Sequence, residues 1–143
     1  MEPCSLAHAN APASEDIRMA IQRTIRDLAA VDSVPLRKLN NEIIYHADIA
    51  LSFYQKRNFS PIWLVGRAVP PKVNEFLNCI LSTKDNGLLP SDYHYGAIST
   101  LTSSTQNSAI PPSVEDLANL EIYLTDAYAL IASHYANGKV SPD

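Results

Sequence analysis

The stretch VEDLANLEIYLTDAYALIASHYA, residues 114–136, predicts the longest helix of the chain. Apolar residues recur along it at steps of three and four, the spacing of one helix face; they are Leu117, Leu120, Leu124, Ala127, Tyr128, Ile131 and Tyr135. Its second half is apolar almost all round, which is typical of a helix that other elements cover. We therefore predict that this helix is central and that the other helices pack against it.

Two helices are predicted in the first part of the chain. The first covers residues 14–30, because Ser14 can cap its first turn and isoleucines follow at helical spacing. The sequence VDSVPLRKL then interrupts regular structure. A second helix is expected from Asn41, which can serve as its cap, to about Tyr54.

Two further helices are predicted before the long one. Pro71 suits the first turn of a helix, and the Asn-Gly pair at 86–87 ends it, because both residues tolerate the positive φ that often closes a helix. A short helix is expected to begin at Ser91 or Asp92. Residues 102–113 are polar and end in prolines, so they are predicted to form an exposed loop.

These signals predict an all-α fold, a compact domain of about five helices around the long C-terminal helix. Residues 1–13 are rich in Ala, Pro and Ser and are expected to be a flexible N-terminal segment. Residues 14–143 are expected to form the helical domain, without internal repeats.

Composition and charge exclude several functional classes. The chain has 143 residues and a net charge of −4, and its 11 Lys and Arg residues are scattered, so no basic surface is expected to bind nucleic acid. The apolar run at 127–132 is far shorter than the ~20 residues that span a bilayer, so the chain is not expected to be membrane-spanning. The N-terminus lacks the apolar core of an intact secretory signal.

The cysteines and histidines give no signal of a metal, a cofactor or a nucleophile. The four histidines lie on different predicted segments and match no zinc motif, and four glycines are too few for a phosphate-binding loop. Cys4 and Cys79 either form one disulfide, if the protein is exported, or remain free thiols. Because Cys79 lies among apolar residues of the third helix, we expect a buried, inert thiol there.

The long helix carries three acidic residues that would have to converge to form a catalytic group. Asp116, Glu121 and Asp126 are five residues apart, a spacing that scatters them around a helix. Solvated positions and caps are therefore the favoured interpretation, and no acid–base pair is predicted. On chemistry alone, this chain is not expected to be an enzyme.

The segment FYQKRNFSPIWLVG, residues 53–66, gathers Phe, Tyr, Phe and the single Trp of the chain. Such residues can fill the core where the second helix ends, each of them burying a large area. They can equally form an exposed platform for a carbohydrate or a peptide. Core packing is the favoured interpretation, and the spacing of these residues alone does not exclude the platform.

Three blocks of the sequence resemble a known family in their order and spacing. FYQKRNFSPIWL, NGLLPSDYHYGAISTL and LEIYLTDAYALIASHYANGKVSP resemble the N-terminal scaffold domain of the large peptidoglycan L,D-transpeptidases of Gram-negative bacteria, over about residues 41–142. Asn86 stands where that family usually has Asp, and both residues suit the turn before Gly87. The positions that match family motifs are Phe53, Tyr54, Arg57, Phe59, Pro61, Trp63, Gly87, Leu88, Pro90, Asp92, Tyr93, His94, Asp126, Tyr135 and Gly138.

The resemblance implies a structural role for this chain. In that family the helical scaffold precedes a peptidoglycan-binding module and a catalytic domain with a nucleophilic cysteine in a Ser-His-Gly-Cys type motif. Neither Cys4 nor Cys79 has the neighbours of that nucleophile, so no catalytic residue is carried over. The resemblance thus implies a non-catalytic piece of a longer periplasmic enzyme that forms 3-3 crosslinks between the stem peptides of the cell wall.

The partners implied are the remaining domains of such an enzyme. Contact with peptidoglycan glycan strands, and dimerisation through an exposed apolar face, are left open. The alternative is a free-standing helical module that binds or regulates cell-wall enzymes or glycan. A third interpretation is an unrelated small helical protein with similar blocks.

Overall fold

Helices make up most of the structure. The computed structural model describes residues 11–33, 36–107, 109–110 and 112–136. Within these ranges its elements are α2 (Ala11–Ala29), β1 (Lys38–Leu39), β2 (Glu42–Ile43), α3 (Ala47–Lys56), α4 (Pro71–Ser82), the 3₁₀ helices η3 (Thr83–Asn86) and η4 (Pro90–Tyr93), α5 (Tyr95–Asn107) and α6 (Val114–Ala136). The predicted all-α domain of about five helices is confirmed, with a small hairpin added to it.

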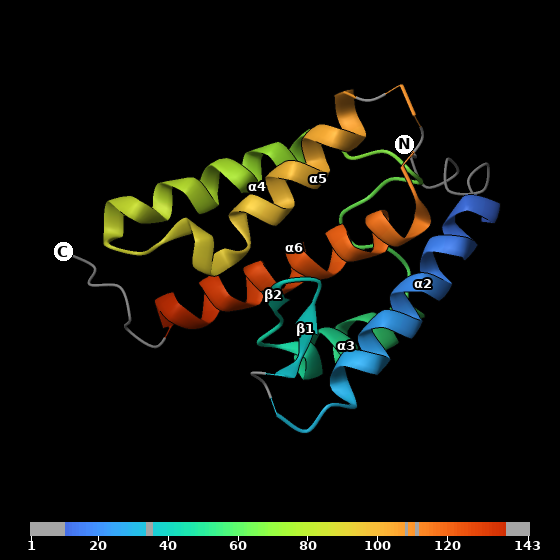
Figure 1. The fold of residues 1–143 in the computed structure, drawn as a ribbon, viewed down its shortest axis with the longest axis horizontal. Coiled ribbons are helices and arrows are strands. Elements are labelled where there is room, and N and C mark those ends of the chain that lie inside the picture. Colours follow the sequence, from blue (N-terminus) through green and yellow to red (C-terminus); the bar gives the residue numbers. More distant parts are fainter. Residues whose placement is uncertain (1–10, 34–35, 108, 111, 137–143) are drawn as a thin grey trace.

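Helix α6 runs through the middle of the molecule, with α4 and α5 on one side and α2, α3 and the hairpin on the other (Figure 1). Every residue from Leu117 to Ala127 is buried. Ser113 caps the first turn, because its hydroxyl oxygen accepts the backbone N–H of Asp116 at 3.0 Å. The prediction of a long central helix over 114–136 is confirmed.

The burial of α6 differs from the prediction in one respect. Its most deeply buried part is the first half, whereas the apolar second half carries Tyr128 and Tyr135 with 53% and 45% of their surface exposed. The segments that cover α6 attach to it near its middle, at Glu121 and Asp126. These two acids are fully buried, so the prediction that they are solvated is wrong.

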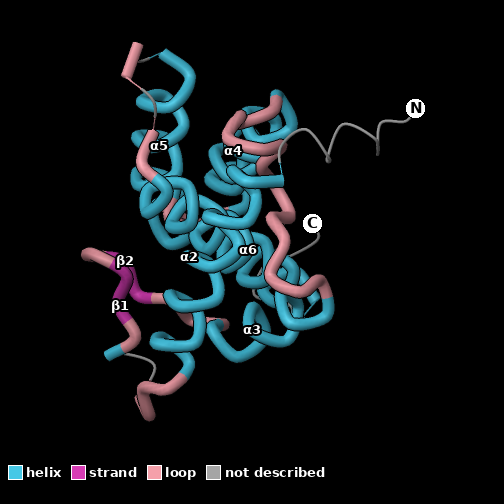
Figure 2. Tube along the Cα trace, turned by 90° about the vertical axis from the view of Figure 1, so that its right-hand side faces the viewer, coloured by secondary structure: helices cyan, strands magenta, loops and turns pink. Residues whose placement is uncertain are grey.

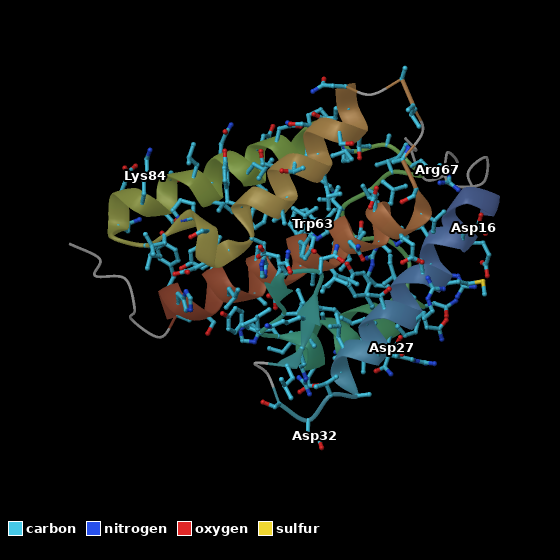
Figure 3. The ribbon with its side chains drawn as sticks, viewed as in Figure 1. Asp16, Asp27, Asp32, Trp63, Arg67 and Lys84 are labelled. Atoms are coloured by element: carbon cyan, nitrogen blue, oxygen red, sulfur yellow. The ribbon has the colours of Figure 1, made fainter. Side chains whose placement is uncertain are left out.

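Helix α2 packs against α6 and α3. It begins at Ala11, earlier than the predicted cap at Ser14, and its isoleucines are buried as their spacing predicts. Arg67 and Asp16 lie at the same end of the molecule (Figure 3), where their side chains form an ion pair at 3.8 Å.

A hairpin replaces the start of the predicted second helix. Strands β1 and β2 pair antiparallel, with Lys38 opposite Ile43, at one edge of the helical layers (Figure 2). Asn40 takes a φ of 55° in the connecting turn, a conformation that Asn tolerates better than most residues. The prediction that Asn41 caps a helix is therefore wrong, since it belongs to this turn and α3 begins only at Ala47.

Arg37 connects the hairpin to the end of α2. Its guanidinium donates to the carbonyl oxygens of Val31 at 2.8 Å and Ala29 at 3.1 Å, and it pairs with Asp48 at 3.3 Å. A buried arginine at a helix C-terminus satisfies carbonyl groups that the helix leaves without partners. The hairpin, which carries Glu42, is thereby held in place beside α6.

Helix α4 begins at Pro71, as predicted, and buries Val73, Leu77 and Ile80. Cys79 is exposed, so the prediction of a buried thiol is wrong. The buried residues are three and four positions apart, and Cys79 falls outside that stripe, on the side that faces water. Cys4 lies outside the described residues, so the question of a disulfide between the two stays untested.

The fourth predicted helix is divided in two. It starts as η4, then His94 takes a left-handed φ of 62°, and α5 follows. Because α5 continues to Asn107 and buries Thr102, the prediction of a loop over 102–113 is wrong for its first part. Packing against α4 and α6 stabilises this helix although its sequence is polar.

Gly87 has a φ of 81° after η3, as the Asn-Gly pair predicts. We expect Gly87→Ala to lower the free energy of unfolding by about 1–2 kcal/mol, because an L side chain is strained at positive φ. Gly96→Ala is the matched control: Gly96 lies in α5, a Cβ there meets nothing within 4 Å, and alanine should stabilise by about 0.4–1 kcal/mol. Urea unfolding measures both, and equal shifts would contradict the prediction.

Candidate functional site

Four of the positions predicted from family motifs, Tyr54, Trp63, His94 and Asp126, belong to two clusters around buried acids of α6. The first group, which we call the Glu121 cluster, consists of Glu121, Tyr54, Thr125 and the backbone of residues 62–64. The second, the His94 cluster, consists of Glu42, His94 and Asp126. Two of the three family blocks are therefore joined to the third, which forms α6.

The carboxylate of Glu121 accepts four hydrogen bonds. Its Oε1 accepts the Tyr54 hydroxyl at 2.7 Å and the backbone N–H of Ile62 at 2.9 Å. Its Oε2 accepts the backbone N–H groups of Trp63 and Leu64, both at 2.8 Å. Because each oxygen has two donors, both are satisfied although the side chain has no contact with water. The acid thus fixes the segment after α3 to the centre of α6.

A chain of polar contacts extends from the Glu121 carboxylate to the indole of Trp63. The indole N–H donates to the Thr125 hydroxyl oxygen at 3.1 Å, and that hydroxyl lies 2.8 Å from the Tyr54 oxygen. Since the Tyr54 hydroxyl uses its one hydrogen to donate to Glu121, the Thr125 hydroxyl is the donor in its hydrogen bond with Tyr54. The polar atoms of Trp63 and Thr125 are consequently occupied within the protein.

Burial governs the pKa values of this cluster. Burial raises the pKa of Glu121, while the N–H groups of residues 62–64 and the Tyr54 hydroxyl oppose that rise by stabilising the carboxylate. Burial, together with the nearby charge of Glu121, raises the pKa of Tyr54 well above its usual range. Tyr54 is therefore neutral at physiological pH and acts as a donor.

The chain leaves α3 through a strained turn. Asn58 and Phe59 have φ values of 56° and 62°, and the N–H of Phe59 donates to the Tyr54 carbonyl oxygen at 2.6 Å. Left-handed backbone is unusual for a bulky residue and persists where the surroundings enforce it. Phe59 is buried beneath Arg26, whose guanidinium carbon lies 5.2 Å from the ring centre. Arg57 donates to the carbonyl oxygen of Pro61 at 2.8 Å and closes the turn.

An open cavity lies beside the Glu121 cluster. Its volume is about 290 Å³, and we call it the aromatic pocket; its lining residues are Phe53, Arg57, Ile62, Trp63, Thr125 and Tyr128. Trp63, near the middle of the molecule in Figure 3, stacks on Phe76 with ring centres 5.0 Å apart and meets Tyr128 edge-on at 6.3 Å. The predicted aromatic residues thus divide between core and surface: Tyr54 and Phe59 are buried, Trp63 is half-buried and Phe53 is exposed.

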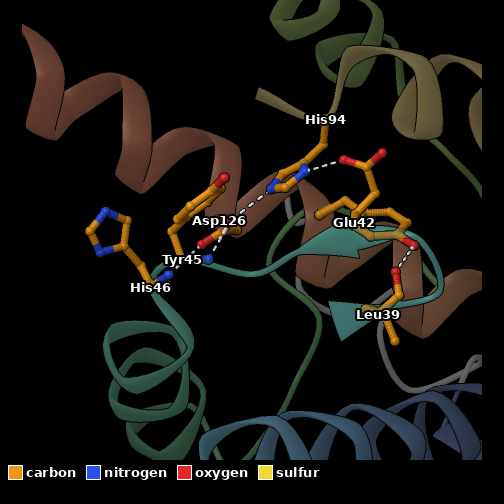
Figure 4. Close-up of polar contacts among 7 residues, drawn as sticks. Leu39, Glu42, Tyr45, His46, His94 and Asp126 are labelled. Carbon is orange, nitrogen blue, oxygen red and sulfur yellow. Dashed lines mark hydrogen bonds and ion pairs between the residues drawn. The ribbon is translucent and has the colours of Figure 1, made fainter. Parts of the chain in front are cut away.

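In the His94 cluster a buried imidazole lies between two carboxylates (Figure 4). His94 Nε2 is 2.6 Å from Asp126 Oδ2, and His94 Nδ1 is 2.6 Å from Glu42 Oε1. Asp126 also accepts the backbone N–H groups of His46 at 2.7 Å and Tyr45 at 3.2 Å. The cluster therefore joins β2, the start of α3, the η4–α5 junction and α6.

The geometry favours a doubly protonated His94. A neutral imidazole has one N–H group and donates to one carboxylate only, whereas both ring nitrogens here have a carboxylate oxygen within hydrogen-bond distance. Burial by itself would lower the pKa of His94, but the hydrogen bonds and charges of Asp126 and Glu42 outweigh it, so the pKa is raised. The Tyr123 ring, 5.6 Å from the imidazole, covers it from α6.

The remaining predicted positions support the same region. Tyr93 is buried and its hydroxyl lies 2.6 Å from His134 Nδ1, while Asn86 donates to the Tyr135 hydroxyl at 2.9 Å. Leu88 is buried, and Pro90 begins η4. Asp92 is exposed and lines a second, polar cavity of about 180 Å³ beside His94. Gly138 lies outside the described residues.

A family sequence model described as Scaffold domain matches residues 48–143. The chain belongs to the Scaffold domain family. The match covers α3 through α6, which includes Glu121, His94 and Asp126, and it is consistent with the resemblance to the scaffold domain of L,D-transpeptidases. Comparisons with curated proteins and with solved structures gave no match.

The buried His94 and Glu121 of this Scaffold domain bond to its own groups. Both nitrogens of His94 and both oxygens of Glu121 are occupied by protein groups, so neither side chain has a free position for a substrate proton. In the part of the chain that the structure describes, no three His, Cys, Asp or Glu side chains are placed to hold a metal ion. None of the described helices combines the length and hydropathy of a bilayer span.

Sequence reasoning missed five side chains of the two clusters and the pocket: Glu42, Ile62, Glu121, Thr125 and Tyr128. For Glu121 a signal was available, because it stands alone within the apolar run LANLEIYL of a helix predicted to be central. An acid in such a position needs buried donors. Glu42 carried no comparable signal, because the hairpin that places it beside His94 was not predicted.

His94 should make the Scaffold domain less stable as the pH rises. A group whose pKa is raised by folding contributes its full stabilisation of the folded state at pH values below its unfolded-state pKa, about 6.5 for His. This contribution is lost as the pH rises through the folded-state pKa. We expect the free energy of unfolding to fall above pH 6.5, by at most about 1.4 kcal/mol per pH unit. Urea unfolding between pH 6 and 9 measures this slope, below the range in which tyrosines titrate.

Two variants test whether His94 causes this fall in the free energy of unfolding. His94→Gln should remove it, whereas His46→Gln should retain it, because only the backbone of His46 binds Asp126 and its ring points away from that acid (Figure 4). A slope of the same size in the His94→Gln variant would contradict the assignment.

Proposed function

We propose that this chain is the non-catalytic scaffold portion of a peptidoglycan L,D-transpeptidase. In this role it positions a catalytic domain and a peptidoglycan-binding module, which form 3-3 crosslinks in the cell wall of the periplasm. Support comes from the Scaffold domain match over residues 48–143 and from the three sequence blocks that resemble that enzyme family. A scaffold family also suits a chain whose buried acids and histidine are occupied by structural bonds.

One observation carries the proposal: hydrogen bonds to two buried acids join the three blocks into a single unit. Glu121 binds the backbone of residues 62–64 in the first block, and Asp126 binds His94 in the second. Both acids belong to α6, the third block. Buried acids with fully satisfied bonds fix the relative positions of distant segments, and they would preserve a defined surface for neighbouring domains.

The size of the native protein tests this proposal. Extracts of the source cells, separated by mass and probed with an antibody against this chain, should show a band several times larger than 15.7 kDa. Fractionation should place that band in the periplasm. A band near 15.7 kDa would contradict the proposal and favour a free-standing module.

A second test concerns catalysis by the chain itself. Purified chain incubated with tetrapeptide-rich muropeptides should produce no crosslinked dimers. Dimers that disappear with the Cys79→Ala variant would overturn the non-catalytic assignment, because Cys79 is the exposed thiol of the described residues.

The alternative, a free-standing helical module that binds cell-wall enzymes or glycan, is favoured by the aromatic pocket. Ligand sites are concave and mostly apolar with a few polar groups, and this cavity has that character. The band size separates the two functions, since the module would be found as the short chain.

A further inference from the structure

The aromatic pocket has walls that are suited to an apolar group and unsuited to a sugar. The indole N–H of Trp63 and the hydroxyl of Thr125 already bond within the protein. A sugar ring presents many hydroxyl groups, and apart from the Arg57 guanidinium the lining has few groups to bind them, which makes covering them unfavourable. An aromatic or branched aliphatic side chain has no such requirement, and the cavity of about 290 Å³ is large enough to accept one.

The charges at the pocket have one sign. Arg57 lines it, and Lys72 lies at its edge, where the ammonium group donates to the carbonyl oxygen of Ile62 at 3.2 Å. No Asp or Glu is among the lining residues. Arg57 is held in place by its bonds to Ser60 and Pro61, and these use two of the five N–H groups of a guanidinium. The remaining N–H groups favour a carboxylate beside the apolar group.

We propose that the aromatic pocket is a docking site for a protein segment in which an aromatic or branched apolar side chain is followed by an acidic one. The inference rests on the proposed function, because a scaffold requires defined points of attachment for its neighbours. Phe, Trp and Tyr side chains around a cavity with an Arg at its rim are typical of the residues that dominate binding energy at protein interfaces.

The single Trp of the chain lies in the pocket wall, so its fluorescence reports occupancy directly. The first probe is the peptide acetyl-Gly-Phe-Asp-Gly-amide, added to the full chain. Matched probes replace Asp by Asn, which removes the charge, or Phe by Ala, which removes the anchor. We expect saturable binding of the Phe-Asp peptide with a dissociation constant on the order of 1 mM. The Phe-Asn peptide should bind at least about threefold more weakly, and the Ala-Asp peptide should not bind measurably.

Two variants of α3 locate the binding. Phe53→Ser should weaken binding of the Phe-Asp peptide at least about fivefold. Ile49→Ser is the matched control, because Ile49 and Phe53 are 47% and 46% exposed on the same helix but Ile49 does not line the pocket. It should bind like the unchanged chain. Thermal unfolding followed by circular dichroism should show that both variants fold.

A third variant isolates the charge. Arg57→Gln should abolish the preference for Asp over Asn, so that the two peptides bind this variant equally, and thermal unfolding should show that it folds. Equal binding of the Asp and Asn peptides to the unchanged chain would overturn the acidic part of the proposal. The absence of any response, or equal loss in both α3 variants, would overturn the site.

A glycan probe separates the other class of ligand. N,N′-diacetylchitobiose should leave the Trp63 fluorescence unchanged. Saturable binding of this disaccharide that Phe53→Ser removes would overturn the peptide proposal in favour of a sugar site. Failure of the peptide probes together with a large native band would reject the docking site alone, whereas a small native band rejects the proposed function.

Discussion

Glu121→Ala is expected to lower the free energy of unfolding by about 3–5 kcal/mol. The substitution leaves the backbone N–H groups of residues 62–64 and the Tyr54 hydroxyl without their acceptor, at a position that is buried or partly buried. Each buried donor without a partner costs about 1–3 kcal/mol before the structure relaxes. Since small domains have total stabilities of about 5–15 kcal/mol, this single change removes a large part of the total. Urea unfolding followed by circular dichroism measures it.

Two further variants distinguish the bonds of Glu121 from the general effect of changing an acid. Asp116→Ala, on the exposed surface of the same helix, should cost at most about 1 kcal/mol, the size of the interaction of a first-turn acid with the helix dipole. Glu121→Gln replaces one acceptor oxygen by an NH₂ group that faces N–H donors, so it should cost about 1–3 kcal/mol. If Glu121→Ala were as mild as Asp116→Ala, the four bonds would not support the segment after α3.

The helices could be predicted because their signals are local. Apolar residues at steps of three and four, with Ser113 as a cap, gave α6 its bounds, and Pro71 gave the start of α4. The hairpin could not be predicted in this way, because its strands have two residues each and show no alternation. Its stability comes instead from contacts of Arg37 and Glu42 with other parts of the chain.

The two buried acids were misjudged for a related reason. Their partners are distant in sequence: Glu121 binds Leu64, 57 residues away, and Asp126 binds Tyr45, 81 residues away. Spacing along one helix describes which residues share a face, but it carries no information on which donors will meet that face. Five-residue spacing therefore led to the wrong environment for both side chains, which are buried.

Asp126→Ala is expected to have an effect of similar size, about 3–5 kcal/mol, for a different reason. The substitution leaves a buried, protonated imidazole with only Glu42 as its partner, and it frees the N–H groups of Tyr45 and His46. A buried charge that loses a partner shifts its pKa toward the neutral form. His94 should therefore titrate at lower pH in this variant, and the fall in stability above pH 6.5 should shrink.

Urea unfolding at pH 6, where the unchanged chain retains the His94 proton, separates the contributions. Asp126→Ala should cost more than His94→Gln, because only the first also removes the acceptor of two backbone N–H groups. The double variant should cost less than the sum of the single ones, since the shared bond is lost only once. Asp27→Ala, exposed on α2, is the control and should change stability by less than about 0.5 kcal/mol. Strict additivity of Asp126→Ala and His94→Gln would mean that the two side chains act independently, and the assignment of a stabilising hydrogen bond between them would fail.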